Sequence, residues 1–298
     1  MKTALPALLL AAVMAAPSAV AQFPAMRGAP GAAAPQIAPQ DLPYTNNIAE
    51  NPGFEKGLAS DPEKGWVERI KNNAEAKCAF VPPNAGFKAF EGKKALHLKI
   101  KSPVKFQPKF LNDPNWGAFV ASANNGKGAS LAGVSQKFPV VPGRLYALRL
   151  RWRSEGLHKT NVDPGPDRGI SQFEIDGTWL PAKGKKMETS GQFKAKPFTT
   201  DASEWTTFAM PDLVAAAAQA AKTKKMPNVA FIRPPKDAAF LMLNLKLNCC
   251  APNVKPEVWI DQFELAEIDL DELKAALLPS LPAAAAQAAA AAGAAKAR

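Results

Sequence analysis

Residues that build disulfide scaffolds and metal sites are scarce in this sequence, which has three cysteines and two histidines among 298 residues. His97 and His158 lie far apart and form no recognisable metal signature. Cys78, Cys249 and Cys250 have no fourth ligand at a suitable spacing, which gives little support for a zinc site. Cys78 can pair with either of the other two, or those two can pair with each other in a strained ring. The sequence therefore predicts no disulfide-dense fold and leaves the pairing open.

Signature motifs of common catalytic sites are also absent. The sequence contains no Gly-x-Ser-x-Gly nucleophile turn, no His-Glu-x-x-His zinc motif and no phosphate-binding loop. The apolar run between Ala4 and Ala16 is too short to span a bilayer comfortably, and no second such run follows it. These absences favour a binding protein over an enzyme and predict no membrane span.

Charge is unbalanced toward the basic side, with a formal net charge of +11. The basic residues are scattered and no nucleic-acid-binding motif appears, so nucleic acid is not an expected partner. The functional interpretation is attraction to anionic surfaces such as acidic polysaccharide, cell wall or lipid headgroups. The alternative is that the excess of positive charge serves only solubility.

Both ends of the chain have the composition of segments outside a folded domain. Residues 1–21 are predicted to be a signal peptide, with a basic start, a short apolar run and a small-x-small cleavage site at Ala19-Val20-Ala21. Residues 22–44 are predicted to be a flexible Ala/Pro-rich linker, and residues 282–298 an Ala-rich tail without an apolar face. The mature chain is therefore expected to be secreted or periplasmic.

Residues 45–268 alternate between apolar and polar side chains with a period of two. In one stretch Leu96 and Leu98 face one way, while His97 and Lys99 face the other. Such one-sided alternation suits antiparallel sheets that have a core face and a solvated face. About ten strands of this kind predict an all-β fold, an antiparallel β-sandwich or jelly roll that forms one domain.

Two segments break the strand pattern. Residues 212–225 predict a helix inserted between strands, and residues 269–281 predict a short C-terminal helix with Asp269 as its N-cap. Long polar loops are expected at residues 101–128, 154–169 and 181–204, where ligand sites often form.

Motifs spread along the domain carry a resemblance to a known family. In chain order they are Asn51-Pro52-Gly53-Phe54-Glu55, Trp66, Ala95-Leu96-His97-Leu98, Val134-Ser135-Gln136-Lys137-Phe138, Val141-Pro142-Gly143-Arg144-Leu145-Tyr146, Trp205 and Trp259-Ile260-Asp261-Gln262-Phe263. Together they resemble the cellulase-associated carbohydrate-binding modules of the galactose-binding-like jelly-roll group. The resemblance covers about residues 48–268 and implies that the first and last strands lie side by side.

The resemblance also implies a structural calcium ion that ties the two ends of the domain together. Its carboxylate ligands would be Glu55 and Asp261. Calcium takes six to eight oxygen ligands, so backbone carbonyls and water would have to complete the set. Gln262 stands where relatives often carry a second acid, and the alternative is that both carboxylates pair with nearby Lys or Arg.

The outward polar residues of the strands are expected to gather on one sheet. Sugars are bound by planar hydrogen-bonding groups and by aromatic rings that stack on the pyranose. Trp179 and Trp116 are predicted rim platforms, whereas the other tryptophans are expected in the core. The alternative is a solvated sheet whose charges pair across strands. The predicted carbohydrate-binding residues are Arg149, Arg151, Arg153, Gln172, Glu174, Asp176, Trp179, Trp116 and Asn244.

The sequence thus predicts a secreted, non-catalytic protein that binds poly- or oligosaccharide through a polar sheet face and rim aromatics. A glycoside hydrolase or its accessory domain is the first alternative, which requires two carboxylates across a cleft. Glu174 and Asp176 lie two residues apart on one strand face and do not flank a bond. The second alternative is a structural or interaction protein of the cell envelope, and either an envelope or an enzyme partner fits these interpretations.

Overall fold

The computed structural model describes residues 47–82, 85–111, 115–160, 169–188, 191–223, 230–271 and 273. The predicted signal peptide, the predicted linker of residues 22–44 and the Ala-rich tail all lie outside these residues. No described helix is long and apolar enough to cross a membrane.

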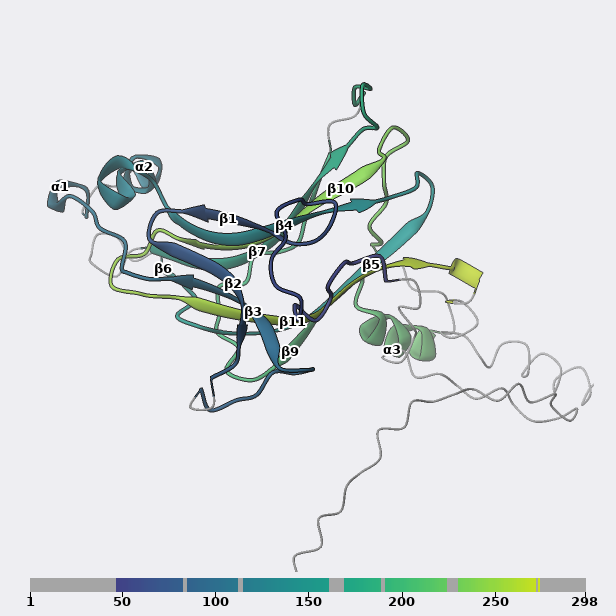
Figure 1. The fold of residues 1–298 in the computed structure, drawn as a ribbon, viewed down its shortest axis with the longest axis horizontal. Helices are drawn as coiled ribbons and strands as arrows, with labels where there is room; N and C mark the ends of the chain where they lie inside the picture. Colours follow the sequence, from purple (N-terminus) through teal and green to yellow (C-terminus); the bar gives the residue numbers. More distant parts are fainter. Residues whose placement is uncertain are drawn as a thin grey trace, which may run out of the picture. The chain divides into compact units, whose positions relative to one another are not determined.

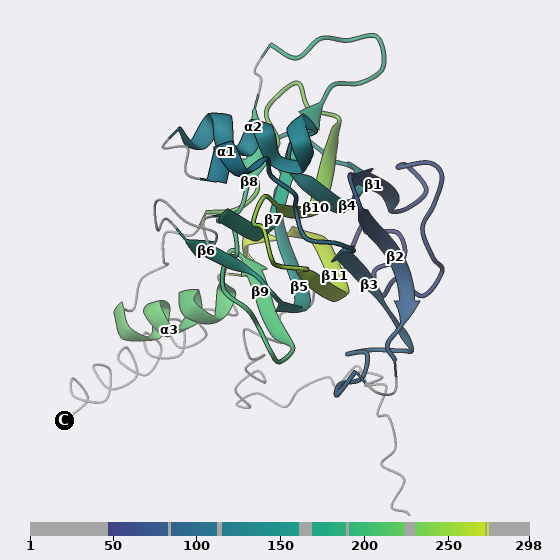
Figure 2. The same cartoon turned by 90° about the vertical axis from the view of Figure 1, so that its left-hand side faces the viewer.

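Eleven strands form two antiparallel sheets, which appear as separate layers in Figures 1 and 2. The six-stranded sheet has the order β1-β4-β10-β7-β6, with β8 paired to β7. Its members are β1 (Val67–Lys71), β4 (Ser130–Pro139), β6 (His158–Thr160), β7 (Gly169–Leu180), β8 (Gln192–Lys194) and β10 (Phe240–Cys249). The five-stranded sheet has the order β2-β3-β11-β5-β9. Its members are β2 (Ala74–Phe80), β3 (Lys94–Ile100), β5 (Leu145–Glu155), β9 (Thr206–Met210) and β11 (Glu257–Ile268).

The predicted antiparallel β-sandwich is confirmed. Leucines at every second position of β10, namely Leu241, Leu243, Leu245 and Leu247, are fully buried, while the residues between them are partly exposed. Each fully buried leucine stabilises the fold by about 1.5–3 kcal/mol relative to an exposed one. The alternation in the sequence therefore places one side of each sheet in a shared core.

The two ends of the domain meet in that core. The resemblance implied that the first and last strands lie side by side, but β1 and β11 belong to different sheets, and it is the segment before β1 that contacts β11. Phe54 and Phe263 both pack on Trp66, with ring centroids 5.8 and 4.9 Å away. The amide of Phe263 donates a hydrogen bond to the carbonyl of Pro52 (2.9 Å), and Asn47 pairs with Ala266 of β11. The last strand is thus held by both the opening segment and the sheet beside it.

A β-bulge in β11 changes the phase of its alternation. The register with β5 shifts between Asp261 and Glu264, and Gln262 adopts a positive φ of 52°. Because the bulge inserts an extra residue, Ile260 and Phe263 both face the core although they are three positions apart. Glu264 is consequently returned to the outer face of the sheet.

Three helices with defined bounds accompany the sheets in the described part of the chain, and one of them was predicted. The inserted helix is confirmed as α3 (Leu213–Thr223), and the carboxylate of Asp212 accepts the amide of Ala215 at its start (3.0 Å). α3 lies beside β9 in both views (Figures 1 and 2). In the predicted C-terminal helix, residues 270, 271 and 273 are helical, and the carboxylate of Asp269 accepts the amide of Asp271 (2.7 Å), as an N-cap does.

The segment 101–128 was expected to be a loop, but it contains α1 (Pro108–Leu111) and α2 (Trp116–Gly126). Asn115 caps α2, since its side chain accepts the amide of Ala118 (3.2 Å). Phe119 is fully buried and stacks on Phe106, with ring centroids 4.2 Å apart. Local aromatic packing and the cap thus stabilise two short helices that lack a long apolar periodicity.

None of the disulfide pairings that the sequence left open is formed, because all three cysteines are free thiols. Cys249 and Cys250 are buried, and burial raises the pKa of Cys249 to about 12. Cys78 is partly buried, and this desolvation raises its pKa to about 12 as well. The three thiols are therefore protonated at neutral pH.

Candidate functional site

The predicted polar surface divides between the two sheets. Arg149, Arg151 and Arg153 lie on β5 of the five-stranded sheet, whereas Glu174 and Asn244 lie on β7 and β10 of the six-stranded sheet. Because the sheets pack back to back, their outer faces point in opposite directions. The prediction that these residues share one sheet is therefore wrong, and the molecule has two distinct polar faces.

On the outer face of the six-stranded sheet, the charged side chains pair with one another. Lys246 Nζ lies 3.3 Å from Glu174 Oε2 and also pairs with Asp176. Asn244 donates a hydrogen bond to Asp176 (2.8 Å), and Gln172 donates one to Glu174. Burial disfavours the charged form of Lys246, but the hydrogen bond to Asp176 and both carboxylate charges outweigh it and raise the pKa of Lys246. The structure thus brings these predicted residues together as a cross-strand network.

Trp179 and Trp116 were predicted to stand exposed and to stack on sugars, but neither is fully exposed. Trp179 is 8% exposed and points into the core, because it shares the parity of Phe173 and Ile175 on β7. Trp116 is half-buried and stacks on Phe119, with ring centroids 5.2 Å apart. Both tryptophans therefore serve packing.

Two tryptophans that were expected in the core lie instead on the outer face of the five-stranded sheet. Trp259 pairs with His97 across β11 and β3, and their rings stack with centroids 3.8 Å apart. Trp205 is half-buried just before β9, and its indole Nε1 donates to the carbonyl of Lys88 (2.8 Å). Trp259 is 6% exposed because the segment between β2 and β3 covers it, rather than because it faces the interior.

The covering segment brings two phenylalanines over the sheet. Phe87 meets Trp259 edge to face at 5.6 Å and Trp205 at 5.9 Å. Phe90, which is 42% exposed, meets Trp205 at 6.3 Å. These aromatic contacts fix the segment against the sheet and create a wall above its outer face.

A hollow of about 460 Å³ lies between this wall and the sheet. We call it the sheet hollow, and it is lined by Pro82, Ala85, Phe87, His97, Lys99, Arg153, Ser154, Glu155, Glu257 and Trp259. Rings of Phe87 and Trp259 thus stand beside charged groups of both signs. Such a mixture of apolar walls and a few fixed polar groups is typical of small-molecule sites.

The acid of Glu257 neutralises one side of the sheet hollow. Its Oε2 lies 3.0 Å from His97 Nε2 and 3.2 Å from Lys99 Nζ. The hydrogen bond with His97, followed by the contact with Lys99, lowers the pKa of Glu257 to about 2, against the effect of burial. Glu257 is therefore ionised at neutral pH and fixes two outward residues of β3.

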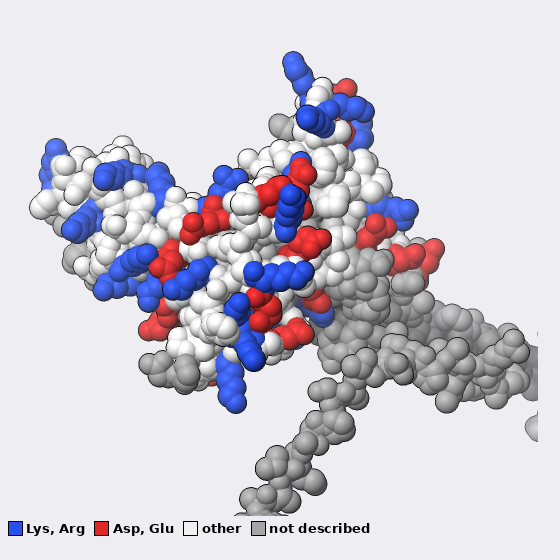
Figure 3. Space-filling view, in the orientation of Figure 1, with Lys and Arg blue, Asp and Glu red and all other residues white. Residues whose placement is uncertain are grey.

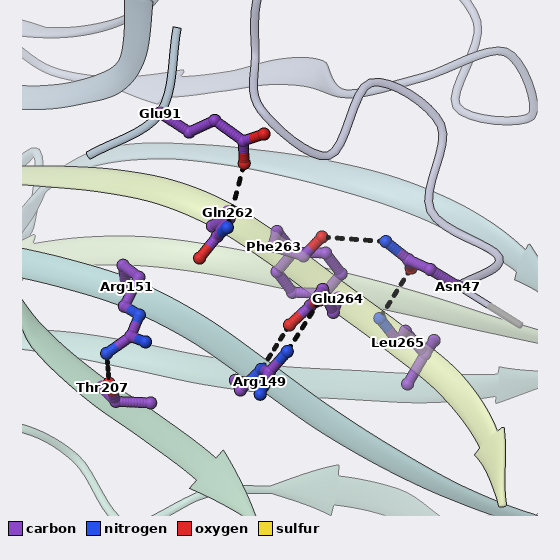
Figure 4. A network of polar contacts seen from close by, with 9 residues as sticks. All are labelled: Asn47, Glu91, Arg149, Arg151, Thr207, Gln262, Phe263, Glu264 and Leu265. Carbon is purple, nitrogen blue, oxygen red and sulfur yellow. Dashed lines mark hydrogen bonds and ion pairs between the residues drawn. The ribbon is translucent and has the colours of Figure 1, made fainter. Parts of the chain in front are cut away.

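The three arginines of β5 have different surroundings, and Figure 4 shows those of Arg149 and Arg151. Arg149 is turned toward Glu264 and binds it through two nitrogens, one of them Nη2 at 3.0 Å. Arg151 is turned toward Thr207 and donates to its hydroxyl, and its guanidinium lies 4.6 Å from the centre of the Phe90 ring. The guanidinium of Arg153 lies 3.7 Å from the centre of the Phe87 ring. Only the first of the three has an acidic partner among the described residues.

On the side drawn in Figure 3, basic and acidic side chains lie next to each other over the body of the sandwich, while the lobe of α1 and α2 shows basic side chains. Over the body of the sandwich on this side, charges of both signs are mixed, so its surfaces differ in how the individual charges pair.

The two predicted calcium ligands, Glu55 and Asp261, both accept backbone amides from residues 91–94, just before and at the start of β3. Asp261 is fully buried, and its carboxylate accepts the amides of Glu91 (3.0 Å) and Gln262 (2.8 Å). Glu55 lines a separate hollow of about 670 Å³ and accepts two backbone amides at 2.8 Å. Burial raises the pKa of Asp261 to about 6. The described residues hold no group of three or more His, Cys, Asp or Glu that fits a metal ion.

Comparisons with known proteins give likenesses of fold alone. No family model matches the sequence, and no curated protein matches it. The enzymatically active domain of tailspike protein 4 from bacteriophage CBA120 aligns with a TM-score of 0.40 at 11% identity; the alignment covers 76% of this chain and 22% of that one.

Two carbohydrate-binding modules also align with this chain, at low identity. TmCBM61, solved with β-1,4-galactotriose, aligns with a TM-score of 0.37 at 15% identity over 74% of this chain and 99% of its own. The C-terminal family 22 module of Clostridium thermocellum Xyn10B aligns with a TM-score of 0.34 at 13% identity over 74% and 92%.

Proposed function

We propose that this protein is a carbohydrate-binding protein and that the sheet hollow is its contact site. The observation that carries the proposal is the combination, in one hollow of about 460 Å³, of aromatic rings with fixed charged groups. Sugars present both apolar ring faces and many hydroxyl groups, so a site for them needs ring surfaces together with donors and acceptors. Phe87 and Trp259 supply the first, and Arg153 and Glu257 supply the second.

The polar groups of the hollow are held in place before any ligand binds. Glu257 is fixed by His97 and Lys99, and Arg153 is fixed over the ring of Phe87. Ordering flexible side chains on binding costs about 0.5–1.5 kcal/mol for each group, so this arrangement favours affinity. The same preorganisation supports binding as the primary activity.

Titration calorimetry against a panel of neutral and acidic polysaccharides tests the proposal. Phe87→Ala is expected to weaken binding about 10-fold or more, because the ring lines the hollow and supports Arg153. Phe80→Ala is the matched control, since Phe80 is 63% exposed and does not line the hollow. A wild-type protein that binds none of the panel, or equal losses in both variants, would refute the proposal.

A hydrolase is the second candidate, and one observation favours it. Glu155 and Glu257 lie directly opposite each other across β5 and β11, and both line the sheet hollow. A glycosidase pair needs one carboxyl group with a raised pKa to act as the acid. Glu257, whose pKa is lowered to about 2, is suited to the ionised nucleophile or base, so Glu155 would have to act as the acid. Turnover of chromogenic glycosides that is abolished in Glu155→Gln would establish the hydrolase instead.

The proposal also includes export from the cytoplasm. We place the protein outside the cytoplasm, secreted or periplasmic, on the strength of the leader-like residues 1–21, with an envelope or enzyme partner as a further expectation. Cleavage after Ala21 on expression in a bacterial host, read by N-terminal sequencing, tests this.

Calcium binding through Glu55 and Asp261 stays a prediction. A rise in melting temperature with calcium chloride that is lost in Glu55→Gln would support it, and an unchanged melting temperature would contradict it.

A further inference from the structure

The charges on the outer face of the five-stranded sheet are unevenly neutralised. Glu264 pairs with Arg149, and Glu257 pairs with both His97 and Lys99. Arg151 and Arg153 form no ion pair with any residue that the structure describes. These two guanidinium groups are therefore the cations of this face that are left for a ligand.

Both guanidinium groups are oriented by the covering segment. Arg151 lies 4.6 Å from the centre of the Phe90 ring, and Arg153 lies 3.7 Å from the centre of the Phe87 ring. Stacking on a ring restricts the planar guanidinium while leaving the hydrogen-bond donors at its edge available. Two successive outward positions of an extended strand are roughly 7 Å apart, so the two groups form a short row along β5.

Arg151 also has an unsatisfied donor. Its Nε–H is buried from solvent and has no hydrogen-bond partner, although its Nη1 donates to Thr207. Burial, followed by the neighbouring positive charge of Arg149, lowers the pKa of Arg151. A buried donor without a partner is costly, so the contacts of Arg151 with the Phe90 ring and with Thr207 hold its side chain against that cost.

The fork of a guanidinium group matches a carboxylate, which accepts two parallel N–H bonds. We propose that the carbohydrate bound by this face is acidic, and that its sugar carboxylates bind Arg151 and Arg153 while its rings lie along the wall of Phe87 and Phe90. The inference rests on the proposed carbohydrate-binding function and specifies the class of sugar as a uronic acid polymer. The net charge of +11 agrees with an anionic partner.

Removing an acidic residue of the hollow should change the affinity for an acidic sugar in the opposite direction to removing the arginines. Glu155 is exposed, lines the sheet hollow and follows Arg153 on the same face of β5. Its negative charge repels a bound carboxylate through solvent, an effect that is modest at an exposed site. Removing it is expected to strengthen the binding of an acidic sugar, whereas removing the arginines weakens it.

Calorimetry with polygalacturonate, its fully methyl-esterified form and dextran sulfate tests the inference. We expect polygalacturonate to bind and the methyl ester, which lacks the charge, to bind at least 10-fold more weakly. Arg151→Gln and Arg153→Gln are each expected to weaken binding of polygalacturonate about 10- to 100-fold. Glu155→Gln is expected to strengthen it about 2- to 5-fold. The matched control is Arg144→Gln, which removes the same charge from an exposed turn.

The outcomes separate the inference from the proposed function. Equal binding of the polymer and its methyl ester would overturn the acidic sugar but leave carbohydrate binding in place. Equal losses in Arg144→Gln and Arg153→Gln would overturn it as well, because they would show unspecific charge attraction. Tighter binding of dextran sulfate than of polygalacturonate, dependent on the same two arginines, would overturn the carboxylate and point to sulfate. Absence of binding to every polysaccharide would refute the proposed function itself.

Discussion

The outer faces of the two sheets have similar polar compositions but different states of neutralisation. On the six-stranded sheet, Lys246 lies between Glu174 and Asp176, so acids and base satisfy one another. On the five-stranded sheet, Arg151 and Arg153 have no acidic partner among the described residues and instead lie over aromatic rings. Polar composition alone therefore does not distinguish the two faces. The five-stranded face, which we propose as the binding face, differs by these two arginines and by the aromatic segment above them.

The largest expected effect concerns the core that both faces share. Phe263→Ala removes a fully buried ring that packs on Trp66 at the junction of the chain ends. We expect the free energy of unfolding to fall by about 3–5 kcal/mol, measured by urea denaturation. Phe80→Ala, at an exposed position, is expected to change it by less than about 0.5 kcal/mol. If the free energy of unfolding falls by less than about 1 kcal/mol in Phe263→Ala, the packing of Phe263 on Trp66 contributes little to the stability of the sandwich.

An intermediate effect is expected on the neutralised face. Lys246→Gln leaves the carboxylate of Glu174, whose side chain is 8% exposed, without its cation. We expect a loss of about 1–3 kcal/mol in stability and unchanged sugar affinity. Because the pKa of Lys246 is raised in the folded protein, the difference from wild type should persist up to about pH 10 and shrink above it. Weaker sugar binding in this variant would break the comparison, since it would assign function to the six-stranded face.

The smallest effect is expected at the ion pair beside the sheet hollow, and it depends on pH. Glu257 has a pKa lowered to about 2, so its contribution to stability is fully present above the unfolded value of about 4.3 and is lost as the pH falls through about 2. The full shift would correspond to roughly 3 kcal/mol, which solvent screening at these partly exposed groups reduces, so Glu257→Gln should cost about 1 kcal/mol at pH 7. The cost should vanish below about pH 2, measured by thermal unfolding. A difference that does not depend on pH would show that the charge of Glu257 does not stabilise this face. Glu155→Gln is the control, and its stability should differ little from that of the wild type at either pH.

Part of the site was readable from strand parity. Trp179 has the same parity as Phe173 and Ile175, so its inward orientation follows from the sequence. The same reasoning places Trp259 on the outer side with Glu257, since Val258 and Ile260 face the core. The position of Phe87 was not readable, because it lies in an irregular segment whose path depends on contacts with distant rings.

The strand content, the inner and outer side of most strands and the inserted helix could be predicted from the local sequence, because the pleat gives every strand a period of two. The meeting of the chain ends was implied by the family resemblance rather than by a local pattern. Which strands share a sheet, and so which charges pair and which have no acidic partner, depends on contacts between distant parts of the chain. Strand pairing joins residues as far apart as Arg149 and Glu264, and a local pattern contains no information about such partners.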